Sequence, residues 1–215
     1  MSKDSLRITE IFYSLQGEGK TVGLPTTFIR LTGCPLRCGY CDTEYAFHGG
    51  ETRRIDDILE EVDKQGAQYI NVTGGEPLAQ KRVHDLMRQL CDAGYHVSLE
   101  TSGALSVSEV DQRVIKVLDV KTPGSGEMAK NLHENYQYLA KGDQVKYVIC
   151  DKTDFDWSKQ HMQEHELADK CEILFSPVQG QLQAVDLANW VIEEKLPVRF
   201  QIQLHKYLWG DTPGK

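Results

Sequence analysis

Apolar and polar residues alternate along this chain in two periods, one typical of helices and one typical of strands. Within residues 55–65, Ile55, Ile58 and Val62 recur at helical spacing on one face, and Gly66 ends the pattern. Similar spacing predicts helices over five further stretches: 83–93, 106–113, 127–140, 156–169 and 182–195.

Short apolar runs between these stretches are typical of buried strands. They lie at residues 27–31, 69–72, 95–99, 114–120, 145–150, 172–175 and 198–204. Strands that alternate with helices predict a parallel sheet with right-handed crossovers. Six or seven strands fall short of a closed eightfold barrel, which typically needs about 250 residues. We therefore expect one α/β domain over residues 1–215, an incomplete, open parallel β/α barrel.

Residues that could bind a ligand or take part in catalysis follow the predicted strands directly. Cys34 comes after the first strand, Gly74 and Gly75 after the second, Thr101 after the third, and Lys121 after the fourth. In parallel α/β folds, ligands bind at the carboxyl ends of the strands. The sequence therefore predicts a single site that gathers these residues.

Charge and composition narrow the class of protein. The formal net charge is −8, with 40% hydrophobic and 26% charged residues, which is typical of a globular protein. Net negative charge argues against binding nucleic acid or a membrane surface through a basic face. No run of 18 apolar residues occurs, and the polar N-terminus lacks the apolar segment of a secretory signal. We expect a cytoplasmic enzyme.

Three of the six cysteines lie within eight residues, at Cys34, Cys38 and Cys41, in a C-x3-C-x2-C spacing. Such clustering in a reducing compartment indicates metal binding. Three thiolates can hold three irons of a four-iron cluster and leave the fourth iron open to a small chelating molecule. Structural zinc with His48 as a fourth ligand, and an unliganded trio, are the alternatives.

The remaining cysteines stand singly, at Cys91, Cys150 and Cys171, and are expected to pack as small buried hydrophobes. Three histidines without ligand-like neighbours in the sequence are expected at the surface: His84, His161 and His165.

The cysteine loop, with Tyr40 before its last cysteine, and the strand-end run Gly74-Gly75-Glu76-Pro77 resemble the radical S-adenosylmethionine superfamily. In that superfamily the amino and carboxylate groups of the methionine part chelate the open iron, and the Gly-Gly-Glu loop lies against the amino group. Two glycines allow the backbone to approach a ligand closely. Glu76 can accept hydrogen bonds from an ammonium.

Further segments resemble one family, 7-carboxy-7-deazaguanine synthase, which acts in the pathway to queuosine and related deazapurines. The segments are Leu15-Gln16-Gly17-Glu18-Gly19, Phe28-Ile29-Arg30-Leu31, Gly33-Cys34-Pro35, Cys41-Asp42-Thr43, Glu100-Thr101-Ser102-Gly103 and His205-Lys206-Tyr207.

The resemblance implies a set of site residues. The pterin substrate would contact Leu15, Gln16, Gly17, Arg30 and Thr101. The binding site of S-adenosylmethionine would be lined by Tyr40, Cys41, Asp42, Gly74, Gly75, Glu76, Gly103, Asp119, Val120, Lys121, Ser176, Pro177, Val178 and Gln179. Cys34, Cys38 and Cys41 would hold the 4Fe-4S cluster, and Thr43 would help to hold Mg²⁺.

Individual side chains suit these roles. The planar fork of Arg30 matches a carboxylate, although a solvated edge residue is the alternative. Gln16 offers a donor and an acceptor to a pterin edge. The chain departs from the family pattern at two places. Relatives often carry Ser-Pro-Lys where this chain has Asp119-Val120-Lys121. Some relatives end soon after the segment that matches His205-Lys206 and use their C-terminal end near the substrate, but this chain continues to Lys215, so that contact is not assigned to Lys215.

By this resemblance the chain is a carbon–nitrogen lyase that converts 6-carboxy-5,6,7,8-tetrahydropterin to 7-carboxy-7-deazaguanine with loss of ammonia. The reduced cluster would cleave S-adenosylmethionine, and the resulting radical would take a hydrogen atom from C6 before ring contraction. A flavodoxin or ferredoxin would donate the electron, and the chain would form a homodimer. The alternatives are an activase of a glycyl-radical enzyme and a non-catalytic, zinc-stabilised binding module.

Overall fold

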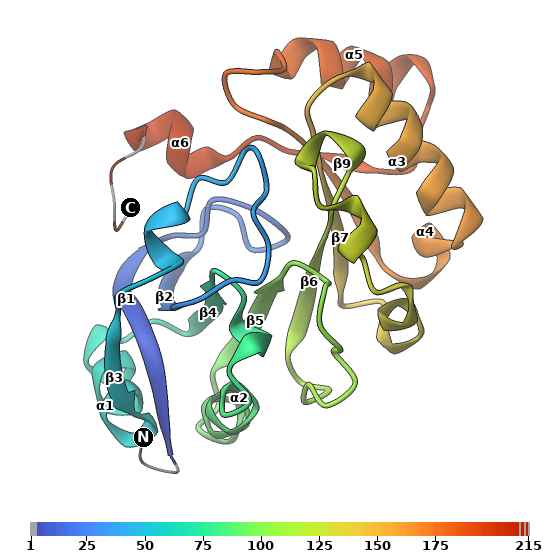
Figure 1. Ribbon diagram of the computed structural model, residues 1–215. Helices are drawn as coiled ribbons and strands as arrows, with labels where there is room; N and C mark the ends of the chain where they lie inside the picture. The colour runs from blue at the N-terminus through green and yellow to red at the C-terminus, as the bar shows by residue number, and fades with distance from the viewer. Residues whose placement is uncertain (1–3, 211, 213, 215) are drawn as a thin grey trace.

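The computed structural model describes residues 4–210, 212 and 214, and shows a curved sheet with helices along its outer side (Figure 1). The strands are β1 (Ser5–Leu15), β2 (Pro25–Leu31), β3 (Glu51–Arg54), β4 (Tyr69–Gly74), β5 (His96–Thr101), β6 (Ile115–Val120), β7 (Gln144–Ile149), β8 (Glu172–Pro177) and β9 (Arg199–Phe200). The α-helices are α1 (Ile55–Gln65), α2 (Val83–Asp92), α3 (Lys152–Glu164), α4 (Leu167–Lys170), α5 (Ala184–Glu193) and α6 (Leu204–Trp209). Five 3-10 helices complete the elements: η1 (Glu44–Ala46), η2 (Pro77–Ala79), η3 (Pro123–Ser125), η4 (Met128–Lys130) and η5 (His133–Tyr138).

The strand order is β3-β1-β2-β4-β5-β6-β7-β8-β9. β2 and the strands from β4 to β9 run parallel, which makes seven, whereas β1 pairs antiparallel with both β2 and β3. β3 and β9 are the two edges and do not pair with each other, so the sheet stays open. The expected open parallel barrel is confirmed.

The two antiparallel strands were absent from the sequence-based prediction. In β1, clean alternation stops after Ile8, because the pairing with β2 shifts register between Ile8 and Glu10. A bulge of this kind places consecutive side chains on irregular faces and erases the period-2 signal. β3 has only four residues, of which three are exposed.

Two predicted elements are wrong, and a third is weaker than predicted. Residues 106–113 form turns instead of a helix, and residues 127–140 contain only the 3-10 helices η4 and η5. The alternating run 198–204 is a strand only at Arg199–Phe200. It then leaves the sheet, because the Gln201 side chain accepts a hydrogen bond from the Gly19 N–H (2.7 Å) and the Leu204 N–H donates to the Gly17 carbonyl (3.0 Å).

The core lies between the sheet and the helices. α1 packs on β1 and β3, α2 on β5, α3 on β7, and α5 on β8 and β9. The predicted faces of α1 and α2 are buried, including Ile58, Val62 and Leu86, whereas Val185 and Ile192, predicted for the buried face of the helix at 182–195, are 62% and 71% exposed on α5. The lone cysteines behave as predicted: Cys150 and Cys171 are buried, and Cys91 packs against the core.

His161 contradicts the prediction that it lies at the surface. It is only 5% exposed and lies beside His165, with His133 of η5 as a third neighbour. α3 buries more of its length than its polar composition indicates, because Tyr147 of β7 hydrogen-bonds the His161 ring. His84 is half-buried.

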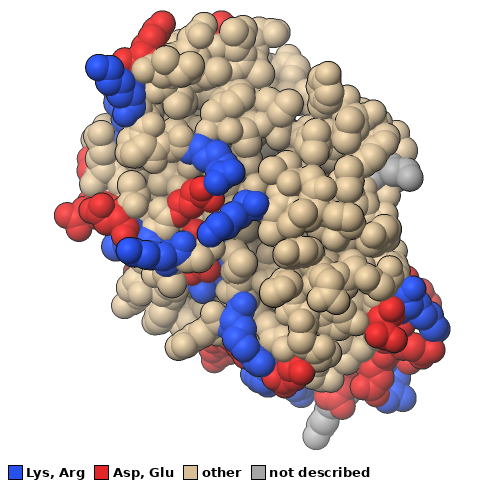
Figure 2. Space-filling view, turned by 180° about the vertical axis from the view of Figure 1, so that it is seen from behind, with Lys and Arg blue, Asp and Glu red and all other residues tan. Residues whose placement is uncertain are grey.

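On the face shown in Figure 2, Lys and Arg side chains lie in small groups together with Asp and Glu side chains. Among the described residues, no helix combines the length and the apolar character that a membrane span requires.

Candidate active site

A cavity of about 680 Å³ opens at the carboxyl ends of the parallel strands. This volume falls in the range of small-molecule sites. The lining includes Cys34 after β2, Gly74 at the end of β4, Thr101 at the end of β5 and Lys121 after β6. The structure therefore brings the predicted strand-end residues together as expected, and α6 adds His205 and Lys206 from the C-terminal end of the chain.

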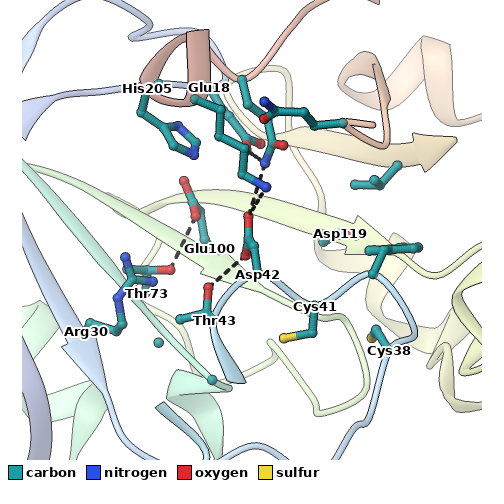
Figure 3. A pocket seen from close by; sticks show the side chains of 18 of the residues that line it. Glu18, Arg30, Cys38, Cys41, Asp42, Thr43, Thr73, Glu100, Asp119 and His205 are labelled. Atoms are coloured by element: carbon teal, nitrogen blue, oxygen red, sulfur yellow. Dashed lines mark hydrogen bonds and ion pairs between the residues drawn. The ribbon is translucent and has the colours of Figure 1, made fainter. Parts of the chain in front are cut away.

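The three clustered thiols line this cavity on one loop, and Figure 3 shows Cys38 and Cys41 beside each other. All three are half-buried free thiols. The loop is held by its own backbone, with the Cys41 N–H donating to the Cys38 carbonyl (3.1 Å), and by Arg37, whose Nη1 donates to the Cys34 carbonyl (2.8 Å). Burial raises the pKa of Cys38 to about 11. Such thiols remain protonated at neutral pH unless a metal replaces the proton.

The donor set fits a cluster of several irons better than one zinc ion. Within residues 4–210, 212 and 214, the one group of three His, Cys, Asp or Glu side chains close enough to share a single ion lies elsewhere and contains no cysteine. In a four-iron cluster, each thiolate binds a different iron, so a wider spacing is expected. Three soft sulfur ligands on the wall of an open cavity also leave room for a ligand at the fourth iron.

Gly74 and Gly75 are required by the fold at this point. A Cβ on Gly74 would collide with the Leu31 carbonyl oxygen, and a Cβ on Gly75 would lie 2.5 Å from the Gly33 carbonyl oxygen and 2.8 Å from the Cys34 Cβ. The two glycines therefore let the end of β4 lie against the cysteine loop while they line the cavity. This close packing joins the two sequence motifs.

Glu76 lies behind the cavity wall and has its own partners. Its carboxylate is fully buried and accepts hydrogen bonds from the Thr101 hydroxyl (2.9 Å), the Ser102 N–H (2.8 Å) and the Leu78 N–H (2.9 Å). The acceptor capacity expected to face an ammonium is thus directed to β5 and η2. Four other predicted cofactor residues also fall outside the lining: Gly103, Val120, Ser176 and Pro177.

Arg30 lines the cavity on the side of Thr73, away from Cys38 and Asp119 (Figure 3). Its side chain is 16% exposed, and its Nε donates to Glu10 Oε1 at 2.7 Å. Tyr45 also donates to this Glu10 oxygen (2.8 Å), and the guanidinium carbon lies 5.8 Å from the Tyr45 ring centroid and from that of Phe12. Arg30 is therefore a fixed side chain of the cavity wall rather than a solvated edge residue.

Alternating charges cross the floor of the cavity. Asp119 lies 3.0 Å from the Lys121 Nζ and 3.4 Å from the Lys146 Nζ, and Lys146 also contacts Glu18 at 2.6 Å. Burial alone would raise the pKa of Asp119, but the two lysines lower it below its usual value. Burial would likewise lower the pKa of Lys146, but Glu18 and Asp119 raise it well above the ordinary value. All these groups are therefore charged at neutral pH.

Asp42 and Thr43 follow the last cysteine directly and face the same cavity (Figure 3). The Thr43 hydroxyl donates to Asp42 Oδ1 (2.8 Å), and Asp42 Oδ2 pairs with the Lys206 Nζ (2.8 Å). Burial would raise the pKa of Asp42, but Lys206 and the Thr43 hydroxyl lower it below its usual range. The loop thus presents an ionised carboxylate and a hydroxyl oxygen.

Several lining residues were not assigned a role from the sequence: Glu18, Thr73, Glu100, Lys146, Gln203, His205 and Lys206. Glu100 accepts from Asn71 (2.7 Å) and from Thr73 (3.3 Å), and lies near the centre of the view in Figure 3. For Lys146, the sequence did contain a signal of a functional role, because a charged residue inside an apolar strand is unusual. The tail also lines the cavity through Gly210, Thr212 and Gly214, whereas Lys215 lies outside the described residues.

The open parallel sheet and the cysteine loop define a radical S-adenosylmethionine protein, and residues 28–119 match the Radical SAM superfamily model. The chain is 44% identical to the 7-carboxy-7-deazaguanine synthase of Chlorobaculum tepidum, over 95% of this chain and 94% of that relative. It is 41% identical to the synthase of the same name from Koribacter versatilis, over 97% of this chain and 100% of the relative. The chain therefore belongs to the 7-carboxy-7-deazaguanine synthase family.

The fold agrees with this membership. The crystal structure of QueE from Escherichia coli superposes with a TM-score of 0.76 at 22% sequence identity, covering 94% of this chain and 95% of that one. At this level of identity, the likeness concerns the fold.

Proposed function

We propose that this chain converts 6-carboxy-5,6,7,8-tetrahydropterin to 7-carboxy-7-deazaguanine with loss of ammonia, as a carbon–nitrogen lyase. The observation that carries the proposal is the single cavity lined by the three thiols together with Gln16 and Arg30, in a chain 44% identical to a 7-carboxy-7-deazaguanine synthase over nearly its whole length. A cavity of about 680 Å³ suits a cofactor and a small substrate together.

Cys34, Cys38 and Cys41 would hold a 4Fe-4S cluster with its fourth iron open to S-adenosylmethionine. When bound, this pair supplies the radical that begins the rearrangement. Gly74 and Gly75 line the cavity beside the cysteine loop, where their backbone would approach the ligand closely. Asp119 and Lys121 place one fixed negative and one fixed positive charge near Tyr40, whose ring centroid is 5.8 Å from the Lys121 Nζ. These charges would orient the polar groups of the cofactor.

Arg30 would bind the substrate carboxylate. Glu10 occupies its Nε, and no hydrogen bond from its terminal nitrogens occurs in the described part of the chain, so these N–H groups remain for a second carboxylate. Gln16 lies buried in the wall beside Gly17, where an amide side chain would pair with the donor and acceptor edge of a pterin. Glu100 faces the same space as an additional acceptor.

Thr43 would take part in a Mg²⁺ site completed by substrate oxygens. Magnesium prefers oxygen ligands and keeps several waters, so one or two protein oxygens suffice. The ionised Asp42 carboxylate beside the Thr43 hydroxyl would attract the cation. The ion pair between Asp42 and Lys206 partly neutralises this negative charge.

Partners of the reaction follow from family membership alone. A flavodoxin or ferredoxin would supply the electron, and the chain would act as a homodimer. An activase of a glycyl-radical enzyme is less favoured, because a wall with Arg30 and Gln16 serves a small polar substrate rather than a protein loop. A zinc-stabilised module is less favoured because the thiols are not grouped for one ion among the described residues.

The decisive experiment uses anaerobically reconstituted protein with a chemical reductant, S-adenosylmethionine and the carboxytetrahydropterin. We expect the deazaguanine acid and one ammonia per turnover, detected by mass spectrometry and by an ammonia assay. Protein with the Cys38→Ala substitution serves as the control and should give neither product. A fully cluster-loaded protein that consumes S-adenosylmethionine without converting the pterin would overturn the assignment.

A further inference from the structure

Three histidines meet on the outer side of the sheet, away from the residues that line the cavity. They are His133 on η5, His161 on α3 and His165 directly after α3, where α3 leads into α4 (Figure 1). One ring nitrogen from each lies within 4.8 Å of the others. Among the described residues this is the one group of three His, Cys, Asp or Glu side chains with such spacing.

The local structure arranges this group from two segments. His161 and His165 are four residues apart, which places both on one helix face, and H-x3-H is a spacing found in zinc sites. His133 is held by its neighbour Asn135, whose amide donates to the carbonyls of Gly103 (3.0 Å) and Leu105 (2.9 Å). The segment that carries His133 is therefore anchored independently of the histidines.

The buried His161 is oriented as a ligand typically is. Its Nδ1 lies 2.8 Å from the Tyr147 hydroxyl, and its ring stacks on Trp157 at 4.6 Å between centroids. Metal-binding histidines usually engage a fixed partner with their second ring nitrogen. The other nitrogen, Nε2, lies 3.3 Å from the Tyr136 hydroxyl, which is longer than a strong hydrogen bond. A metal ion bound at Nε2 would replace this contact.

The chemical type of the ligands narrows the choice of metal ion. Three imidazoles without a carboxylate or thiolate suit zinc, nickel or copper, and not magnesium or calcium. In tetrahedral zinc the nitrogens are roughly 3.4 Å apart, given Zn–N distances of about 2.0–2.1 Å. The exposed His133 ring and the half-buried His165 ring can rotate to close this gap.

We propose that His133, His161 and His165 form a second metal site that binds one divalent transition-metal ion, zinc in the first instance, with water in the fourth position. The ion ties η5 to the end of α3. It lies apart from the cysteine loop, so it supports the covering layer of the sheet and takes no part in the radical chemistry.

The test measures zinc in full-length protein whose thiols are already occupied by the iron–sulfur cluster. The protein is equilibrated with chelator-buffered Zn²⁺, and bound iron and zinc are counted by mass spectrometry. We expect one zinc per chain beyond the iron, and at least tenfold weaker zinc binding in His133→Ala and in His165→Ala. Zinc should also raise the melting temperature of the parent and leave that of these two variants unchanged.

His96→Ala is the matched control, because His96 is also an exposed histidine with an aromatic neighbour, Tyr69, 5.2 Å away between centroids. It should bind zinc as the parent does, with iron content equal in all variants. His133 is exposed, so its replacement leaves the core intact and decides the matter even if His165→Ala folds poorly. Parent protein that holds no more zinc than His133→Ala would overturn the proposal.

Discussion

Single side chains in the cavity owe their position to partners distant in the sequence. Arg30 is held by Glu10, and Lys146 by Glu18, 128 residues away along the chain. Buried charges are tolerated only when they are paired, because leaving one unpaired costs several kcal/mol. The pairing therefore keeps these groups ionised and aimed at the cavity before any ligand arrives.

The clustered and the lone cysteines should respond differently to substitution. We predict that Cys34→Ala, Cys38→Ala and Cys41→Ala each abolish the cluster and turnover, because each removes the thiolate of one iron. Cys91→Ala should retain full iron, since Cys91 only packs against the core. Iron and sulfide analysis after anaerobic reconstitution checks this, and equal iron loss in folded Cys91→Ala protein would contradict the division of roles.

Arg30→Ala should weaken pterin binding more than tenfold, because a charge-assisted hydrogen bond contributes about 1.5–3 kcal/mol. Cluster content should stay unchanged. Arg53→Ala is a suitable control, since Arg53 on β3 pairs with Glu61 on α1 and does not line the cavity. Binding is measured by titrating the cluster-loaded protein with the pterin, and equal affinity in Arg30→Ala and the parent would make Arg30 structural.

Thr43→Val deletes a hydroxyl with little change in shape and should weaken the activation of turnover by Mg²⁺. The reason is the loss of one oxygen ligand, together with loss of the hydrogen bond to Asp42. Turnover is compared for parent and variant in metal-depleted buffer titrated with Mg²⁺. The magnesium proposal fails if the parent ignores Mg²⁺ or if the two titration curves coincide.

At the scale of elements, the site depends on how strand ends are joined. Glu76 follows β4, and its carboxylate links η2 to the end of β5 through Leu78, Thr101 and Ser102. The two glycines before it allow β4 to lie against the cysteine loop. One buried carboxylate and two absent side chains thus fix the relative position of three cavity-forming segments.

Glu76→Gln should lower the free energy of unfolding by about 1–3 kcal/mol, because its amide NH₂ would face the Thr101 and Ser102 donors and leave buried groups unsatisfied. Urea unfolding of the parent and the variant measures the change. Glu109→Gln, at an exposed position, controls for the general effect of the substitution. Unchanged stability in Glu76→Gln would contradict the structural role of these hydrogen bonds.

At the scale of the whole molecule, the open sheet leaves one end of the cavity to be covered by the C-terminal part of the chain. α6 provides His205 and Lys206, and the tail adds Gly210, Thr212 and Gly214. The first and last thirds of the sequence therefore meet over the same space, and the Leu204 N–H binds the Gly17 carbonyl at 3.0 Å.

Removal of residues 210–215 should raise KM for the pterin severalfold and leave iron content unchanged. The expected cause is the loss of wall contributed by the tail, while the cysteine loop and its supports remain. Steady-state kinetics on reconstituted protein, with iron analysis alongside, checks both expectations. An unchanged KM would show that the tail only borders the cavity.

Features that depend on neighbours along the chain could be read from the order of the amino acids alone. Three thiols within eight residues are adjacent in any fold, helical faces such as that of α1 follow from spacing, and strand-end motifs converge once the strands are parallel. For this reason the cysteine loop, the open α/β sheet and the strand-end part of the cavity wall were predictable.

Features that depend on contacts between distant segments became visible only in the folded chain. The bulged β1, the early departure of the chain from β9, the direction of the Glu76 carboxylate and the meeting of His133 with His161 are of this kind. None leaves a periodic signal, because each arises when a side chain or backbone group finds a partner that no local pattern specifies. Hydrogen bonding and close packing across the sheet, rather than propensity, set those positions.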